Sequence, residues 1–198
     1  MPKILILYYS TNGSCEAMAN LISRGVSSVN NAQPICRTVP QLKPINDPQY
    51  QAMPKQGYPY ATLKDLEQAD GLCLGCPTYF GNMPAAMKAF WDQTTSLWFN
   101  GSLVNKPAGL FTSASSLHGG HESTLLSMML PLLHHGMLIT GIPYTEKALA
   151  TTTSGGTPYG ASHMAGNESR APITEAEKQL CIALGKRIAN LATLTTST

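Results

Sequence analysis

The strongest constraint on the fold is a repeated unit, in which a short apolar run leads through a loop of small residues into helical periodicity. The first unit begins with KILILYY at residues 3–9, passes through the loop 10–14, and continues as a helix predicted over residues 15–29. A run that is apolar at nearly every position is typical of a strand covered on both faces of a parallel sheet. Because parallel strands are joined by helical crossovers, the chain is predicted to adopt an α/β fold.

Further strands are predicted at residues 34–39, 71–76, 108–112 and 137–142. Five strands that alternate with helices favour a doubly wound parallel sheet in the order 2-1-3-4-5, with helices on both faces. The helices are marked by Asn82 as an N-cap with Pro84 in the first turn, by Pro131 as a kink before a stop at Gly136, and by the capping box Thr174-x-x-Glu177.

The chain is predicted to be one domain over residues 1–198, because it shows neither an internal repeat nor a second compositional region. Two irregular insertions, at about 40–60 and 143–171, fit no regular element. Loops of this length are usually functional or lie at an interface. Charged residues make up only 12% of the chain, about half the usual ~25%, so copies of the chain are expected to cover part of its surface.

Composition also narrows the function classes. The formal net charge of +2 is too small to favour nucleic acid or an anionic membrane as a partner. No apolar run approaches the ~20 residues that a membrane helix needs. The start Met1-Pro2-Lys3 runs directly into a strand, which leaves no room for a signal peptide, so a cytoplasmic location is expected.

The cysteines do not predict a redox or metal site. There are five, scattered along the chain, and this odd number is not a disulfide framework. Cys73 and Cys76 match C-x-x-C, but they lie within a predicted strand, where alternation points them to opposite faces or nearly so. No second pair completes a metal site, and the thiols are predicted to be buried and inert.

Three loops carry the chemistry. Residues 10–14, 77–82 and 113–120 follow the first, third and fourth predicted strands and contain no Lys, Arg, Asp or Glu. Loops at the carboxyl ends of such strands converge on the crevice where ligands bind. Hydroxyls, glycines and backbone N–H groups suit a phosphate at a helix N-terminus and a planar polar ring, which points to flavin mononucleotide (FMN).

The alternative interpretation is an ordinary strand-to-helix turn followed by two surface loops. Other phosphate motifs are missing: there is no G-x-x-x-x-G-K-[ST], and no G-x-G-x-x-G follows the first strand. The sequence therefore argues against a P-loop NTPase and against a Rossmann dehydrogenase.

At this point the motifs match a known family. The chain resembles the WrbA-type NAD(P)H:quinone oxidoreductases, a flavodoxin-like group that uses FMN, and the resemblance runs from end to end. Leu133-His-His-Gly-Met137 and Gly155-Gly-Thr-Pro-Tyr-Gly-Ala161 are its most specific stretches. The other matching stretches are residues 4–10 with Gly13, Pro77-Thr-x-Phe-Gly-Asn82, Leu97-Trp98, Phe111-Thr-Ser113 and Gly119-Gly120.

The resemblance implies FMN contacts, a substrate position and an assembly. It implies that His134 and Trp98 are the catalytic residues, with Trp98 beside the isoalloxazine where quinone or nicotinamide stacks. It also implies a homotetramer in which a partner subunit helps to wall the site. The implied cofactor-binding residues are Ser10, Thr11, Asn12, Gly13, Ser14, Cys15, Pro77, Thr78, Tyr79, Phe80, Gly81, Ser113, Ala114, Ser115, Ser116, Leu117, His118, Gly119 and His134.

Two positions depart from the family's pattern, and both bear on the choice between NADH and NADPH. Asn12 stands where an aromatic residue is often found, and Tyr79 stands where an arginine is common. The two catalytic candidates also have structural alternatives. A histidine such as His134 is favoured at a helix C-terminus by the dipole alone, and Trp98 could be a core aromatic.

These features predict an FMN-dependent NAD(P)H:quinone oxidoreductase that reduces quinones to hydroquinones by two electrons in a ping-pong reaction. A protective role against oxidative stress would follow. The main alternative is a flavodoxin-type one-electron carrier, although such carriers usually present a strongly acidic face. A third possibility is a scaffold protein that keeps the fold but has lost the flavin.

Overall fold

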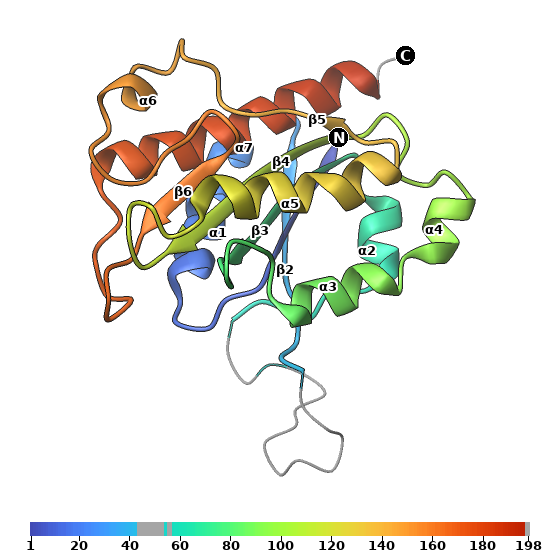
Figure 1. Cartoon of the computed structure of the whole chain (residues 1–198). Helices are drawn as coiled ribbons and strands as arrows, with labels where there is room; N and C mark the ends of the chain where they lie inside the picture. The colour runs from blue at the N-terminus through green and yellow to red at the C-terminus, as the bar shows by residue number, and fades with distance from the viewer. Residues whose placement is uncertain (43–53, 55–56, 197–198) are drawn as a thin grey trace.

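The computed structural model describes residues 1–42, 54 and 57–196, and its centre is a parallel sheet in the order β2-β1-β3-β4-β5 (Figure 1). This order confirms the α/β class and the predicted strand arrangement. The central strands largely follow apolar runs, because burial on both faces excludes most polar side chains, whereas the edge strand over residues 33–38 contains Gln33 and Arg37 and is only partly buried. The strands are β1 (Lys3–Tyr8), β2 (Gln33–Thr38), β3 (Gly71–Pro77), β4 (Pro107–Ala114) and β5 (Leu138–Ile139).

The fifth position of the sheet is divided between two short strands. β5 pairs with the first residues of β4, and β6 (Ala161–Met164) pairs in parallel with the last ones. The strand predicted at 137–142 is therefore too long. At Gly141 an added Cβ would lie 1.9 Å from the carbonyl oxygen of Pro158, because the returning chain crosses there backbone to backbone.

The insertion predicted to be irregular at 143–171 is accordingly corrected, since it contains β6 and the short helix α6 (Lys147–Thr151). The other predicted insertion, at about 40–60, falls mostly outside the described residues.

Helices cover both faces of the sheet, as predicted. α1 (Ser14–Ser27) and α7 (Glu175–Thr195) pack on one face, against Ile4, Ile6 and Phe111. The other face is covered by four helices, which pack on Leu5 and Leu7: α2 (Leu63–Gln68), α3 (Ala85–Asp92), α4 (Thr95–Phe99) and α5 (His121–His134).

α1 and α7 approach each other unusually closely through two glycines. A Cβ added at Gly25 of α1 would lie 2.1 Å from the carbonyl oxygen of Ile182. One added at Gly185 of α7 would lie 2.2 Å from the carbonyl oxygen of Ile22. The two backbones are therefore in direct contact, which no residue with a side chain would permit.

The predicted capping box and the predicted helix stop at Gly136 are confirmed, whereas the predicted N-cap at Asn82 is wrong. The capping box of Thr174 and Glu177 opens α7. Gly136, with φ +74°, follows α5, which continues through Pro131. Asn82 is not the N-cap of α3, which begins at Ala85 after Pro84.

The predicted burial of the cysteines is also confirmed. Cys73 and Cys76 are fully buried, and they belong to the two opposite faces of the sheet. Burial raises the pKa of both thiols. Within the described part of the chain, no group of His, Cys, Asp or Glu is placed to hold a metal ion, and no helix is long and apolar enough to cross a membrane.

Candidate functional site

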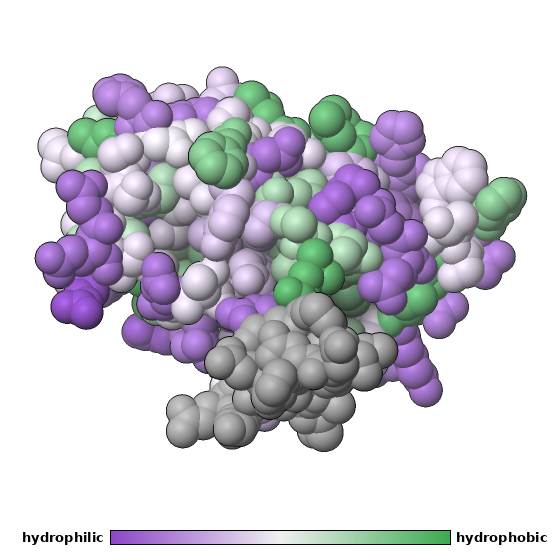
Figure 2. Space-filling view, turned by 60° about the horizontal axis from the view of Figure 1, so that its bottom comes forward, coloured by the Kyte–Doolittle hydropathy of each residue, from purple (hydrophilic) through white to green (hydrophobic). Residues whose placement is uncertain are grey.

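A cavity of about 210 Å³ lies where the carboxyl ends of β1, β3, β4 and β6 meet, at the lower edge of Figure 1 that Figure 2 turns towards the viewer. It brings together eleven of the predicted cofactor-binding residues from all three loops. They are Ser10, Thr11, Asn12, Ser14, Cys15, Pro77, Thr78, Tyr79, Ser113, Ala114 and Ser115.

The first loop presents the start of α1 to this cavity. Gly13 is the N-cap residue with φ +87°, and no side chain caps the helix. Ser10 is held in place because its Oγ accepts a hydrogen bond from the Gly13 N–H at 3.1 Å. The N–H groups of the first helical turn have no partner within the helix, so together with the dipole they form a site for an anion.

The second and third loops are locked together beside it. The Thr78 N–H donates to the carbonyl of Ser113 at 2.9 Å, and the Thr124 hydroxyl donates to Thr78 Oγ1 at 2.7 Å. A Cβ added at Gly120 would lie 2.9 Å from the Cα of Gly81. This close backbone contact explains why the third loop ends in glycine, and it makes one rigid wall from two loops.

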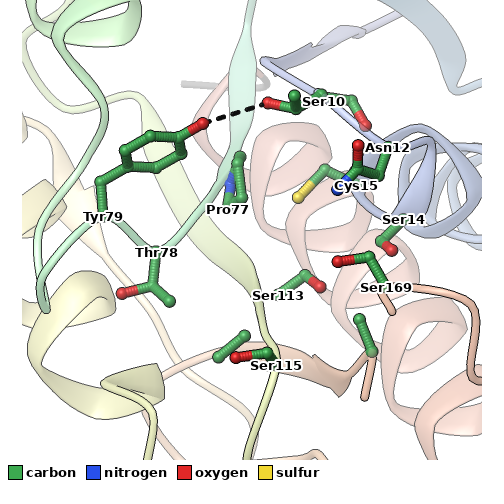
Figure 3. Close-up of a pocket in the computed structure, with 13 residues that line it drawn as sticks. Ser10, Asn12, Ser14, Cys15, Pro77, Thr78, Tyr79, Ser113, Ser115 and Ser169 are labelled. Atoms are coloured by element: carbon green, nitrogen blue, oxygen red, sulfur yellow. Dashed lines mark hydrogen bonds between the residues drawn. The ribbon is translucent and has the colours of Figure 1, made fainter. Parts of the chain in front are cut away.

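Tyr79 lies on the side of the cavity opposite Ser14, and its hydroxyl reaches Thr11 of the first loop. Figure 3 shows Tyr79 on one side and Ser14 with Ser169 on the other. The Tyr79 hydroxyl lies 3.5 Å from that of Thr11. The Cys15 thiol also lines the cavity, but burial raises its pKa well above the ordinary value, so it is a neutral wall rather than a nucleophile.

A fourth segment lines the cavity beside the three loops, and it was not predicted. Ala165 and Ser169 line the cavity from the segment that follows β6. The signal was weak because β6 itself contains Ser162 and His163 and does not have the apolar character of a buried strand. Recognition of β6 would have placed residues 165–169 at the same edge of the sheet as the other loops.

The remaining predicted cofactor residues do not line the cavity. Gly13 and Gly81 contribute backbone turns, and the Phe80 side chain is fully exposed at φ +53°. The far half of the third loop folds back on itself: the Gly119 N–H donates to the carbonyl of Ser116 at 3.1 Å. The other residues of this group are Leu117, His118 and His134.

Trp98 and His134 come together, but elsewhere. They line a second cavity of about 330 Å³ with Trp91 and His135, at the C-terminal end of α5. α5 begins at His121, beside the third loop, and its 14 residues at ~1.5 Å each span about 20 Å. The single chain therefore does not bring the two predicted catalytic residues to the first cavity.

The first cavity suits FMN. Its lining contains hydroxyls, amides and backbone groups and no Lys, Arg, Asp or Glu. A phosphate fits at the start of α1, where N–H groups and the dipole compensate its charge. The hydroxyls of Thr78, Ser113 and Ser115 offer hydrogen bonds to a polyol chain and a ring edge.

Comparison with known proteins agrees with this chemistry. The family described as NADPH-dependent FMN reductase matches residues 2–149. Two relatives named NAD(P)H dehydrogenase (quinone) each align over 97% of this chain and 98% of their own length. The one from Chromohalobacter salexigens is 41% identical, and the one from Gluconacetobacter diazotrophicus is 38% identical.

The fold has solved counterparts as well. The crystal structure of a WrbA-like flavodoxin from Agrobacterium tumefaciens aligns over 98% of this chain and 99% of its own, with a TM-score of 0.68 and 21% identity. These matches confirm the resemblance inferred from the motifs and the flavodoxin-like fold.

Proposed function

This chain belongs to the NADPH-dependent FMN reductase family, and on that premise we propose that it is an NAD(P)H:quinone oxidoreductase that reduces quinones to hydroquinones. Two relatives of this name, at 38–41% identity over nearly the whole chain, support the proposal. The observation that carries it is the uncharged cavity at the start of α1, whose donors suit FMN and leave the redox chemistry to the flavin.

FMN would supply the redox chemistry, which is acceptance of a hydride from NAD(P)H and donation of two electrons, with two protons, to a quinone. The first loop and the open end of α1 would hold its phosphate. The hydroxyls of Thr78, Ser113 and Ser115 line the cavity and would hydrogen-bond the polar edge of the ring, where negative charge grows on reduction, without titrating. Because the cavity is small, nicotinamide and quinone share one open side, so oxidised nucleotide leaves before quinone enters, which is a ping-pong order.

The small cavity also supports an assembly. Its volume of about 210 Å³ lies below the ~300–1,000 Å³ of typical ligand pockets, so the cavity would enclose only part of a bound FMN. Trp98 and His134 are too far away in the same chain to cover it. We infer that Trp98 and His134 of a second copy complete the wall, as in the homotetramer that the resemblance implies.

An apolar surface fits this assembly. Leu126, Leu130 and Leu133 are exposed at helical spacing on α5, and Trp98 and Phe99 are exposed on α4. An apolar group is visible at the right-hand edge of Figure 2, on the side where α4 lies. Surfaces of this kind usually mark protein–protein contacts.

The test is anaerobic spectroscopy of the FMN-loaded protein. Excess NADH should bleach the flavin without a semiquinone band, and added benzoquinone should restore the oxidised spectrum at once. A flavin that ignores NADH but forms a stable semiquinone with dithionite would instead identify a one-electron carrier. The net charge of +2 argues against the acidic docking face of such carriers. A cytoplasmic location and a role against oxidative stress remain predictions.

A further inference from the structure

A buried carboxylate lies behind the proposed flavin cavity. Glu177 Oε1 accepts hydrogen bonds from the N–H groups of Gly155 at 2.8 Å and Met164 at 3.0 Å. Glu177 Oε2 accepts from the N–H of Thr174 at 2.7 Å, and His163 Nδ1 lies 3.0 Å from the same oxygen. The side chains of Glu177 and His163 are 0% and 1% exposed, so one carboxylate gathers four donors in the interior.

This carboxylate accepts a hydrogen bond from the edge strand β6, on the side where no further strand of the described residues pairs with it. In the part of the chain that the structure describes, β6 pairs only with β4. The Ala165 N–H donates inward, to the carbonyl of Ala114 at 2.8 Å. The preceding N–H, that of Met164, is partly buried, and Glu177 accepts its hydrogen bond in place of a neighbouring strand.

Glu177 is charged in the folded protein. Burial alone would raise its pKa, but hydrogen bonds from His163 and from the backbone of Thr174, Met164 and Gly155 lower the pKa to about 2. An uncharged replacement would leave several buried donors without an acceptor, which is costly.

The hydrogen bonds of Glu177 lie next to the fourth segment that lines the cavity. His163 and Met164 are the last residues of β6, and Ala165 and Ser169, which line the cavity, follow them. His163 is also the register partner of Ser113, at the start of the third loop. Neither His163 nor Glu177 lines the cavity.

We propose that Glu177 and His163 are positioning residues that set the affinity for FMN by fixing residues 164–169 against the third loop. The inference rests on the proposal that the first cavity holds FMN. A residue that only stabilises the fold would lower the melting temperature without a selective effect on flavin affinity.

The experiment measures FMN affinity of the apoprotein by quenching of flavin fluorescence, together with hydrogen exchange of residues 164–169. His163→Leu removes the donor to Glu177, whereas His163→Asn keeps a donor two bonds beyond Cβ. Leu66→Ala, in the core on the opposite face of the sheet, is the control for lost stability. All are compared at a temperature at which each is fully folded.

We expect His163→Leu to weaken FMN binding at least tenfold and to speed exchange of residues 164–169. We expect His163→Asn to stay within threefold of the original affinity, and Leu66→Ala to leave both readouts unchanged. Unchanged affinity in His163→Leu, or an equal loss in Leu66→Ala, overturns the inference.

A further variant separates this inference from its premise. Ser14→Tyr fills the cavity and should abolish FMN binding. If Ser14→Tyr binds FMN normally, FMN lies elsewhere, and both proposals fail. If Ser14→Tyr loses FMN while His163→Leu keeps it, only the positioning role is refuted.

Discussion

The stability of this protein in acid should depend on Glu177. Its pKa falls from the ordinary 4.5 to about 2 on folding. At ~1.4 kcal/mol for each pKa unit, this difference corresponds to roughly 3 kcal/mol. Because the pKa is lower in the folded state, the contribution is complete above about pH 4.5 and is lost as the pH falls towards 2.

The assay is urea unfolding of the apoprotein between pH 7 and pH 3, for the original chain and for Glu177→Gln. At pH 7 Glu177→Gln should be less stable by roughly 3 kcal/mol, since an amide offers no second acceptor for the four donors. The gap should narrow below pH 4.5, by up to ~1.4 kcal/mol per pH unit, because only the original chain loses this carboxylate's contribution.

Glu175→Gln is the matched control. Glu175 lies in the same first turn of α7, but its side chain is 74% exposed, so its loss should cost less than ~1 kcal/mol at pH 7. A gap between the original chain and Glu177→Gln that stays constant from pH 7 to pH 3 would refute the reasoning. It would mean that folding does not change the proton affinity of Glu177.

Three further outcomes are expected. Trp98→Ala should impair quinone turnover more than FMN retention, measured by steady-state reduction and by flavin titration; an equal loss of both would show that Trp98 has no separate role in turnover. Gly185→Ala should destabilise by about 2 kcal/mol or more in urea, since its Cβ would lie 2.2 Å from the Ile22 carbonyl oxygen; the ~1 kcal/mol gain expected from helix propensity alone would contradict the close packing. Cys73 and Cys76 should resist a thiol reagent until the protein unfolds, and their joint replacement by Ala should leave quinone reduction intact; prompt labelling of the native protein would show that they are accessible.

Most of the sheet could be predicted because burial on two faces leaves a direct mark on the sequence. β1 after Lys3, β3, and β4 up to Phe111 are apolar, and the order of the strands follows from their alternation with helices. β6 could not be predicted in this way. His163 is tolerated in a buried strand only because Glu177, 14 residues further on, accepts its hydrogen bond, and that contact is not visible in the sequence.

The candidate site also contains residues whose position could be predicted from the sequence and residues whose position could not. The loop residues next to strand ends, such as Ser10, Thr78 and Ser113, lie in the cavity because the sheet brings them there. The place of Trp98 and His134 depends on where α5 ends and on what a second copy covers. The spacing of the motifs in the sequence indicates neither where α5 ends nor which surface a second copy covers.

The contact between α1 and α7 also has a consequence for biosynthesis. α1 supplies the anion site at residue 14, whereas α7 (Glu175–Thr195) is synthesised after all the other helices and strands that the structure describes. Until then the inner face of α1, with Met18, Ile22 and Val26, has no helix to pack on. Formation of the cavity should therefore require synthesis of α7, and a chain cut short before α7 should fail to bind flavin and should be open to proteolysis.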